Sequence, residues 1–178
     1  MTLPHTSQHY YLQPGVLKAT GEVGMYQHIM VALDGSELAE CVLPHVEAIA
    51  SGCQVSTVTL VRVVPPLKLY GGAETRLSPE ERHRLEVDSL EMAAGYLEEK
   101  AEALRKKGVA VETRVLFGNV VEQLVDFARS AGVDLIITAT HGRSGASRLF
   151  LGSVADRLLR ASPVPVLMVR APGSVHGL

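Results

Sequence analysis

DLIITATHGRSGASRLFLGSVADRLLR, residues 134–160, is the stretch that decides the fold. Its first five residues form a short, mostly apolar run of strand length. A loop rich in glycine and serine follows. Ser153 and Asp156 then form a candidate capping box that opens a helix, and Leu159 lies on its predicted inward face. The stretch therefore predicts a strand, a loop and a covering helix, which is the repeating unit of a parallel sheet.

The same alternation of strand and helix patterns extends outward along the chain. It predicts an α/β fold: a five-stranded parallel sheet with strand order 3-2-1-4-5 and helices on both faces. Pro44 falls inside the first helix and predicts a bend there. Pro165 restricts the last strand to an edge or to its own first residues. The predicted strands are residues 28–33, 55–64, 109–116, 134–138 and 164–169, and the predicted helices are residues 36–52, 78–107, 119–131 and 153–161.

Composition is typical of a single domain of 178 residues, with 47% hydrophobic residues and no Trp. The formal net charge is −2 and the basic residues are scattered, so we expect no nucleic-acid partner. The longest apolar runs have strand length, so we expect no membrane span. Cys41 and Cys53 form no zinc pattern and are expected as reduced thiols of a cytoplasmic protein. Residues 1–25 lack sustained periodicity and are expected to be an N-terminal extension.

Two loops are predicted to meet where the direction of winding reverses, between the first and fourth strands. The turn Asp34-Gly35-Ser36 follows the first strand and offers a carboxylate for ribose hydroxyls or an adenine amino group. The second loop contains Gly142, which allows close approach of the backbone to an anion, and Arg143, a cation for outer phosphates. It ends at Gly152-Ser153, a helix start whose free N–H groups favour phosphate. Each feature alone is also compatible with an ordinary turn, cap or loop.

These motifs resemble the universal stress protein family over roughly residues 26–170. The turn at Asp34 is similar to the family's opening. Residues 140–145, 151–154 and 163–167 are similar to its closing signature. The resemblance implies a family domain over residues 26–172, with a short tail at 173–178, and the Rossmann-like fold of adenine nucleotide alpha hydrolases. It also implies a homodimer paired through the last strand, from Val164 to Val169.

ATP-binding members of the family carry the pattern Gly-x2-Gly-x9-Gly-Ser/Thr, and this chain matches it from Gly142 onward. The position of the first glycine is occupied by Ala139, whose methyl group either crowds a phosphate or is harmless if its backbone angles are ordinary. The resemblance implies that Asp34 and Val63 hold the nucleoside. It implies that phosphates contact backbone or side-chain groups of the second loop and helix start, namely Ala139, Gly142, Arg143, Gly152, Ser153 and Val154.

Two functions remain open at this point. The first is an ATP-binding stress protein that acts as a nucleotide-dependent switch or sensor, with Mg²⁺ or Mn²⁺ arriving with the phosphates. The second is a family member that binds no nucleotide and serves as a dimeric interaction module. We expect no enzyme beyond slow ATP hydrolysis and assign no catalytic residue. The chain has no Walker A Gly-Lys-Ser/Thr sequence, and no suitable acid and histidine follow Ser144 in triad order, since His176 falls in the C-terminal tail. No carboxylate cluster for a metal is apparent.

Overall fold

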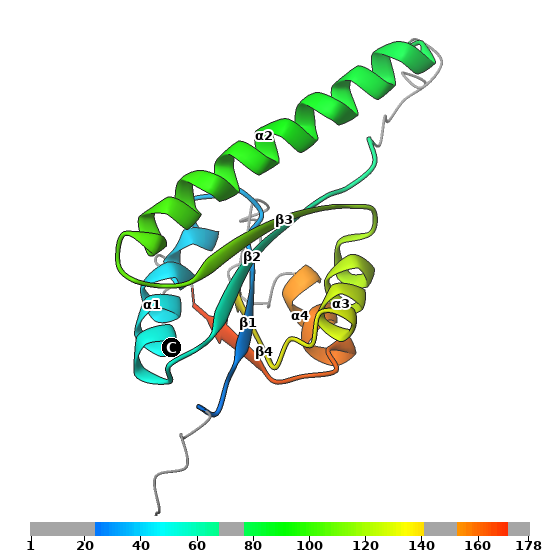
Figure 1. The fold of residues 1–178 in the computed structure, drawn as a ribbon. Helices are drawn as coiled ribbons and strands as arrows, with labels where there is room; N and C mark the ends of the chain where they lie inside the picture. The colour runs from blue at the N-terminus through cyan, green and yellow to red at the C-terminus, as the bar shows by residue number, and fades with distance from the viewer. Residues whose placement is uncertain (1–23, 68–76, 141–152, 171–178) are drawn as a thin grey trace, which may run out of the picture.

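The computed structural model describes residues 24–67, 77–140 and 153–170. Its centre is a five-stranded parallel sheet with the order β3-β2-β1-β4-β5, as the sequence predicts (Figure 1). Winding proceeds from β1 outward to β3, then returns to β4 on the other side of β1. The strands are β1 His28–Ala32, β2 Thr57–Val64, β3 Val111–Phe117, β4 Leu135–Ala139 and β5 Val166–Val169.

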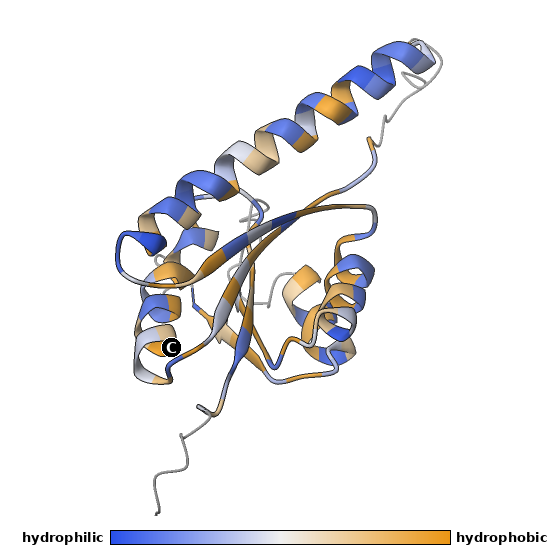
Figure 2. Cartoon of the chain, viewed as in Figure 1, coloured by the Kyte–Doolittle hydropathy of each residue, from blue (hydrophilic) through white to orange (hydrophobic). Residues whose placement is uncertain are grey.

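Helices cover both faces of this sheet, and each face has its own apolar core. Helices α1 and α2 pack on one face with Ile29, Val31 and Leu60, while α3 and α4 pack on the other with Met30 and Val61. Figure 2 shows hydrophobic residues along the central strands and hydrophilic ones on the outer helix surfaces. The helices are α1 Leu43–Gly52, α2 Pro79–Arg105, α3 Val120–Ser130 and α4 Ser153–Ala161, and a short 3-10 helix, η1 Ala39–Val42, precedes α1.

The central strands are apolar because both of their faces are covered. All five residues of β4 are buried, and Ile29, Met30 and Val31 of β1 are fully buried. An alternating pattern would expose one face to water, whereas these strands have continuous apolar runs. Burial on both faces holds β1 and β4 in place at the middle of the sheet. It therefore also sets the positions of their carboxyl ends, from which the candidate site is built.

Side chains at the helix starts explain where two of the helices begin. Ser78 accepts a hydrogen bond from the Glu81 backbone N–H, and the Glu81 carboxylate accepts one from the Ser78 N–H. The Asn119 side chain accepts from the N–H groups of Val121 and Glu122 at the start of α3. These bonds satisfy N–H groups that have no partner within a helix. Both helix starts agree with the sequence prediction.

Two expectations about helix interiors were wrong. Pro44 does not bend a long helix, because the predicted helix is divided into η1 and α1 and Pro44 lies in the first turn of α1. A proline is compatible with that turn, where its missing N–H would have no helical acceptor. Leu159 does not face the core: it is 43% exposed, whereas Ala155 and Leu158 of α4 are buried.

The two edges of the sheet differ in chemistry. At the outer strand β3, Glu112 and Arg114 are exposed and form an ion pair with 3.0 Å between Oε2 and Nη2. At the other edge, β5 consists of Val166, Leu167, Met168 and Val169, and the first three are half-buried. Exposed charges on an edge strand oppose pairing with another chain, and an apolar edge does not.

Candidate functional site

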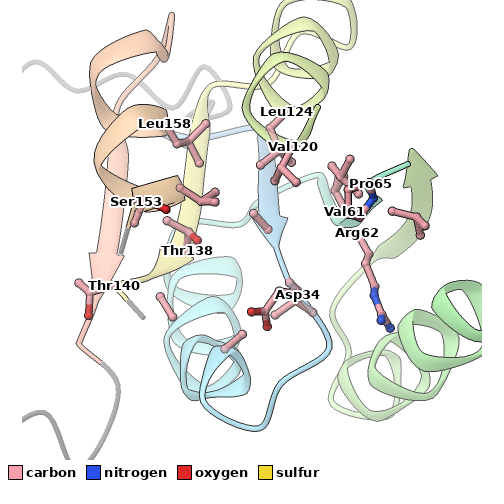
Figure 3. Close-up of a pocket in the computed structure, with 18 of the residues that line it drawn as sticks. Asp34, Val61, Arg62, Pro65, Val120, Leu124, Thr138, Thr140, Ser153 and Leu158 are labelled. Carbon is pink, nitrogen blue, oxygen red and sulfur yellow. The ribbon is translucent and has the colours of Figure 1, made fainter. Parts of the chain in front are cut away.

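A pocket of about 530 Å³ opens at the carboxyl ends of β1, β2 and β4 (Figure 3). The reversal of winding separates the loops that follow β1 and β4, so a crevice forms at this end of the sheet. Its size lies within the usual range for small-molecule sites. The lining combines apolar side chains from β2, α3 and α4 with a few polar groups, among them Asp34, Arg62, Thr138, Thr140 and Ser153.

The turn after β1 has a built-in hydrogen-bond pattern. Asp34 Oδ1 accepts from the Ser36 N–H at 2.9 Å and from the Ser36 hydroxyl at 2.6 Å. The Ser36 hydroxyl oxygen in turn accepts from the Ala39 N–H at 3.2 Å, at the start of η1. Gly35 has a φ of 83°, a backbone conformation that favours glycine. The turn therefore holds the Asp34 carboxylate in a defined place on the pocket wall.

Beside this turn, β2 extends beyond its last register pair with β1. The last β1–β2 register pair is Ala32 with Val61, and the Leu33 N–H donates to the Val61 carbonyl at 2.9 Å. Alternate carbonyls of a strand face the same side, so the main chain of Val63 faces the same side as that of Val61. Strand β1 has ended at that level, and Val63 lines the pocket. Its peptide groups therefore face the space in which a ligand would lie.

Arg62 is the charged pocket residue that sequence reasoning missed. Its guanidinium packs against the Asp34 turn, since a Cβ on Gly35 would lie 2.7 Å from Arg62 Cζ. The same guanidinium lies over the ring of Tyr96 on α2, 5.2 Å from the centroid. Burial, and next the negative charge of Glu40, raise the pKa of the Tyr96 hydroxyl, so the ring stays neutral at physiological pH. The available signal was that Arg62 is the one charged residue in β2.

The end of β4 and the start of α4 form the opposite wall. Thr138 and Ala139 are buried and line the pocket at the end of β4. Ser153 is the first residue of α4 rather than the residue before it, and with Val154 it brings the amino end of this helix to the pocket. A helix amino end carries unpaired N–H groups and a partial positive charge, which favour an anion.

The pocket unites five of the eight predicted site residues. Figure 3 shows Asp34 and Ser153 at the same crevice, on opposite sides of it. The predicted residues that line it are Asp34, Val63, Ala139, Ser153 and Val154. The predictions for Gly142, Arg143 and Gly152 lie outside the described residues.

The described parts of the chain hold neither a metal-ligand cluster nor a membrane-spanning helix. Over residues 24–67, 77–140 and 153–170, no group of three or more His, Cys, Asp or Glu side chains could hold a metal ion. Within the same ranges, no helix combines the length and apolar content that crossing a bilayer requires.

Comparisons with known proteins agree on one family. The family model for the universal stress protein family matches residues 25–170. Universal stress protein MJ0577 of Methanocaldococcus jannaschii is 31% identical over 160 residues, which cover 84% of this chain and 98% of that protein. Universal stress protein MJ0531 of the same organism is 30% identical over 165 residues, with 92% of each chain covered.

Solved structures give the same result for the fold. A structure of MJ0577 superposes with a TM-score of 0.72 at 30% identity, covering 84% of this chain and 99% of that one. The universal stress protein of Archaeoglobus fulgidus, solved in complex with dAMP, superposes with a TM-score of 0.54 at 25% identity, covering 80% and 97%. Both structures match over nearly their whole length.

Proposed function

Because the chain belongs to the universal stress protein family, we propose that it binds ATP across the carboxyl ends of β1, β2 and β4. In this proposal it acts as a nucleotide-dependent switch in a stress response. The observation that supports it is the single pocket shared by the acidic turn at Asp34 and the amino end of α4 at Ser153. One end of that pocket suits a nucleoside and the other suits an anion.

At the nucleoside end, the Asp34 carboxylate would accept hydrogen bonds from ribose hydroxyls or the adenine amino group. The main chain of Val63 would meet the edge of the base, because it faces the space beyond the end of β1. The apolar side chains of Val61, Val120 and Leu124 line the same pocket and would cover the faces of the ring. A related protein, from Archaeoglobus fulgidus, was solved with dAMP, which supports an adenine nucleotide here.

At the phosphate end, the backbone N–H groups and hydroxyl at Ser153, together with Val154, would meet the phosphates. The proposal adds Gly142, Gly152 and the Arg143 cation from the loop before α4, and Mg²⁺ or Mn²⁺ carried by the nucleotide. Asp34 is the acidic side chain among the described lining residues and lies across the pocket from Ser153. It is therefore remote from a terminal phosphate, and we assign ATP the role of a bound effector with at most slow hydrolysis.

The proposal is tested on freshly purified protein. We expect denaturation of the protein to release an adenine nucleotide, which mass spectrometry identifies. We also expect titration calorimetry to detect ATP binding to protein from which the nucleotide has been removed. GTP serves as the control for base selectivity. If no nucleotide is retained and no ATP binding is measured, the chain is instead the dimeric interaction module that the sequence left open.

Ala139 is the position at which this chain departs from the family's glycine pattern. It is the last residue of β4, pairs with Val169 of β5, and does not have a positive φ. Its side chain packs in the core formed with α1 and α2. The local backbone therefore does not require glycine.

We expect Ala139→Gly to leave ATP affinity within about twofold of the wild type while lowering the free energy of unfolding by about 0.5–1 kcal/mol, because glycine loses more backbone freedom on folding. Calorimetry and urea unfolding measure the two effects. A large gain in ATP affinity would show that the methyl group obstructs phosphate binding.

The apolar β5 edge suits the homodimer that the family resemblance implies. The carbonyls of Pro165 and Val169 accept hydrogen bonds from Ile136 and Thr140 N–H groups, on the β4 side. By alternation, the peptide groups of Val166 and Met168 face the outer edge. Pairing of two such edges would continue the sheet from one protomer into the next.

Replacing Met168 with lysine is expected to convert a dimer into monomers, because it adds a charge to the half-buried outer edge of β5. Light scattering during gel filtration gives the mass. Phe117→Lys is the matched control, since Phe117 is a 41% exposed apolar residue on the opposite edge strand. A Met168 variant that keeps the dimeric mass would contradict pairing through β5.

A further inference from the structure

The side chain of Arg62 lies between α2 and the turn that carries Asp34. We infer that Arg62 is a positioning residue for the nucleoside end of the pocket, acting through the Asp34-Gly35-Ser36 turn rather than by contact with phosphate. This inference rests on the proposed nucleotide site. It assigns to β2 a part in ligand affinity beyond the main-chain contact at Val63.

The contact between Arg62 and the turn is close and extends over the guanidinium. A Cβ built on Gly35 would lie 2.7 Å from Arg62 Cζ and 2.8 and 2.9 Å from its two terminal nitrogens. Any side chain at position 35 would therefore collide with the guanidinium plane. The glycine satisfies two requirements at once, the φ of 83° and the space that Arg62 occupies.

A packed aromatic ring is another neighbour of this guanidinium. Tyr96 lies on the half-buried side of α2, next to the fully buried Leu97, and Arg62 Cζ is 5.2 Å from its ring centroid. A planar guanidinium stacks on an aromatic face and keeps its N–H groups at the rim, which an ammonium group cannot do. Arg62 is thereby fixed against a helix anchored in the core.

The position of Arg62 in the pocket separates positioning from phosphate binding. Asp34 and Arg62 are the charged residues among the described lining residues. Figure 3 shows the Arg62 side chain extending toward α2, with Ser153 on the far side of the crevice. The strand order agrees, because β1 lies between β2 and β4. Arg62 therefore supports the wall that would hold the nucleoside.

Loss of this support should lower the binding affinity of every ligand that contacts the nucleoside end of the pocket. Binding groups need to be held within about 0.5 Å of their productive geometry, and the turn carries the proposed carboxylate acceptor. Without Arg62, a gap separates the turn from Tyr96 and the turn can shift into it. Adenosine, AMP and ATP would then lose affinity by the same factor, whereas loss of a phosphate contact would spare adenosine.

The test compares Arg62→Met with Lys100→Met. Both residues are cations over the same Tyr96 ring, but Lys100 lies 5.4 Å from the centroid and pairs with Glu40 at 3.1 Å. Affinities for adenosine, AMP and ATP are measured by displacement of a fluorescent ATP analogue. We expect Arg62→Met to weaken all three by about tenfold and Lys100→Met to change them by less than about twofold. Arg62→Lys should recover only part of the loss.

A second readout needs no ligand, so it separates this inference from the proposed function. The Ser36 N–H donates to Asp34 Oδ1, and its hydrogen exchange reports whether the turn is closed. We expect exchange at Ser36 to accelerate at least about fivefold in Arg62→Met and to stay unchanged in Lys100→Met. If wild-type protein binds no adenine ligand but the Arg62→Met protein shows this exchange pattern, the proposed function fails and only the support of the Asp34 turn by Arg62 is retained.

Several results would overturn the inference. A loss confined to AMP and ATP would make Arg62 a phosphate ligand. Full recovery by Arg62→Lys would make charge alone sufficient. Equal effects from Lys100→Met would attribute the change to packing of the Tyr96 ring, and unchanged Ser36 exchange in a folded Arg62→Met protein would remove the contact with the turn as a cause.

Discussion

Asp34→Asn is expected to weaken ATP binding by about 10- to 100-fold, which corresponds to about 1.5–3 kcal/mol for a hydrogen bond to a charged acceptor. The amide oxygen of asparagine can still accept from the Ser36 N–H, so the turn after β1 keeps its closing bond. The variant therefore removes the negative charge without dismantling the wall. Titration calorimetry with ATP measures the change.

Two companion variants sharpen this experiment. Asp34→Ala removes both the charge and the acceptor for Ser36, so it should bind ATP no better than Asp34→Asn. Glu37→Gln removes an equal charge from an exposed position three residues along and should bind ATP like the wild type. Wild-type affinity in Asp34→Asn would exclude the carboxylate as a charged ligand for the nucleotide.

Ile137→Ala is expected to lower the free energy of unfolding by about 2–5 kcal/mol, the cost of removing buried methyl groups and leaving a cavity. Ile137 is fully buried on β4, where it packs in the core with α1 and α2, and its neighbours on β1 and β5 are Val31 and Leu167. A central strand covered on both faces has little freedom to collapse into the space. Urea unfolding followed by circular dichroism measures the loss.

The control for this substitution is the same change at Ile49. That residue is half-buried on α1 and packs against the same core from its rim. We expect Ile49→Ala to cost clearly less than Ile137→Ala, because part of the side chain is already in contact with water. Equal costs at the two positions would contradict the central position of β4 in the core.

The fold could be predicted from the sequence because its signals are local. Continuous apolar runs such as that of β4, and caps such as Ser78 and Asn119, each indicate an element from a few neighbouring residues. Alternation of those elements then leaves few topologies to choose from. Pro44 was misinterpreted because a proline is compatible both with a bend inside a long helix and with the first turn of a new one, and the apolar spacing around it continues through both η1 and α1.

The candidate site was predictable only in part. Asp34 lies two residues beyond the end of β1 and Ser153 is the first residue of α4, so topology alone brings them to one end of the sheet. The position of Arg62 depends on Gly35, which is 27 residues earlier, and on Tyr96, which is 34 residues later (62 − 35 and 96 − 62). That meeting requires the crossing of α2 over the sheet. Contacts between residues this far apart in the sequence can be identified only in the folded structure.

The unlike edges of the sheet limit how far self-association can proceed. Association of two β5 edges about a twofold axis leaves each β3 edge facing outward. Growth of such dimers into a filament would require the β3 edge of one dimer to meet that of another, which would bring two exposed Glu112–Arg114 pairs together. Polymerisation through the sheet is therefore disfavoured after the first association. Pairing through the apolar β5 edge would not lead to open-ended fibres.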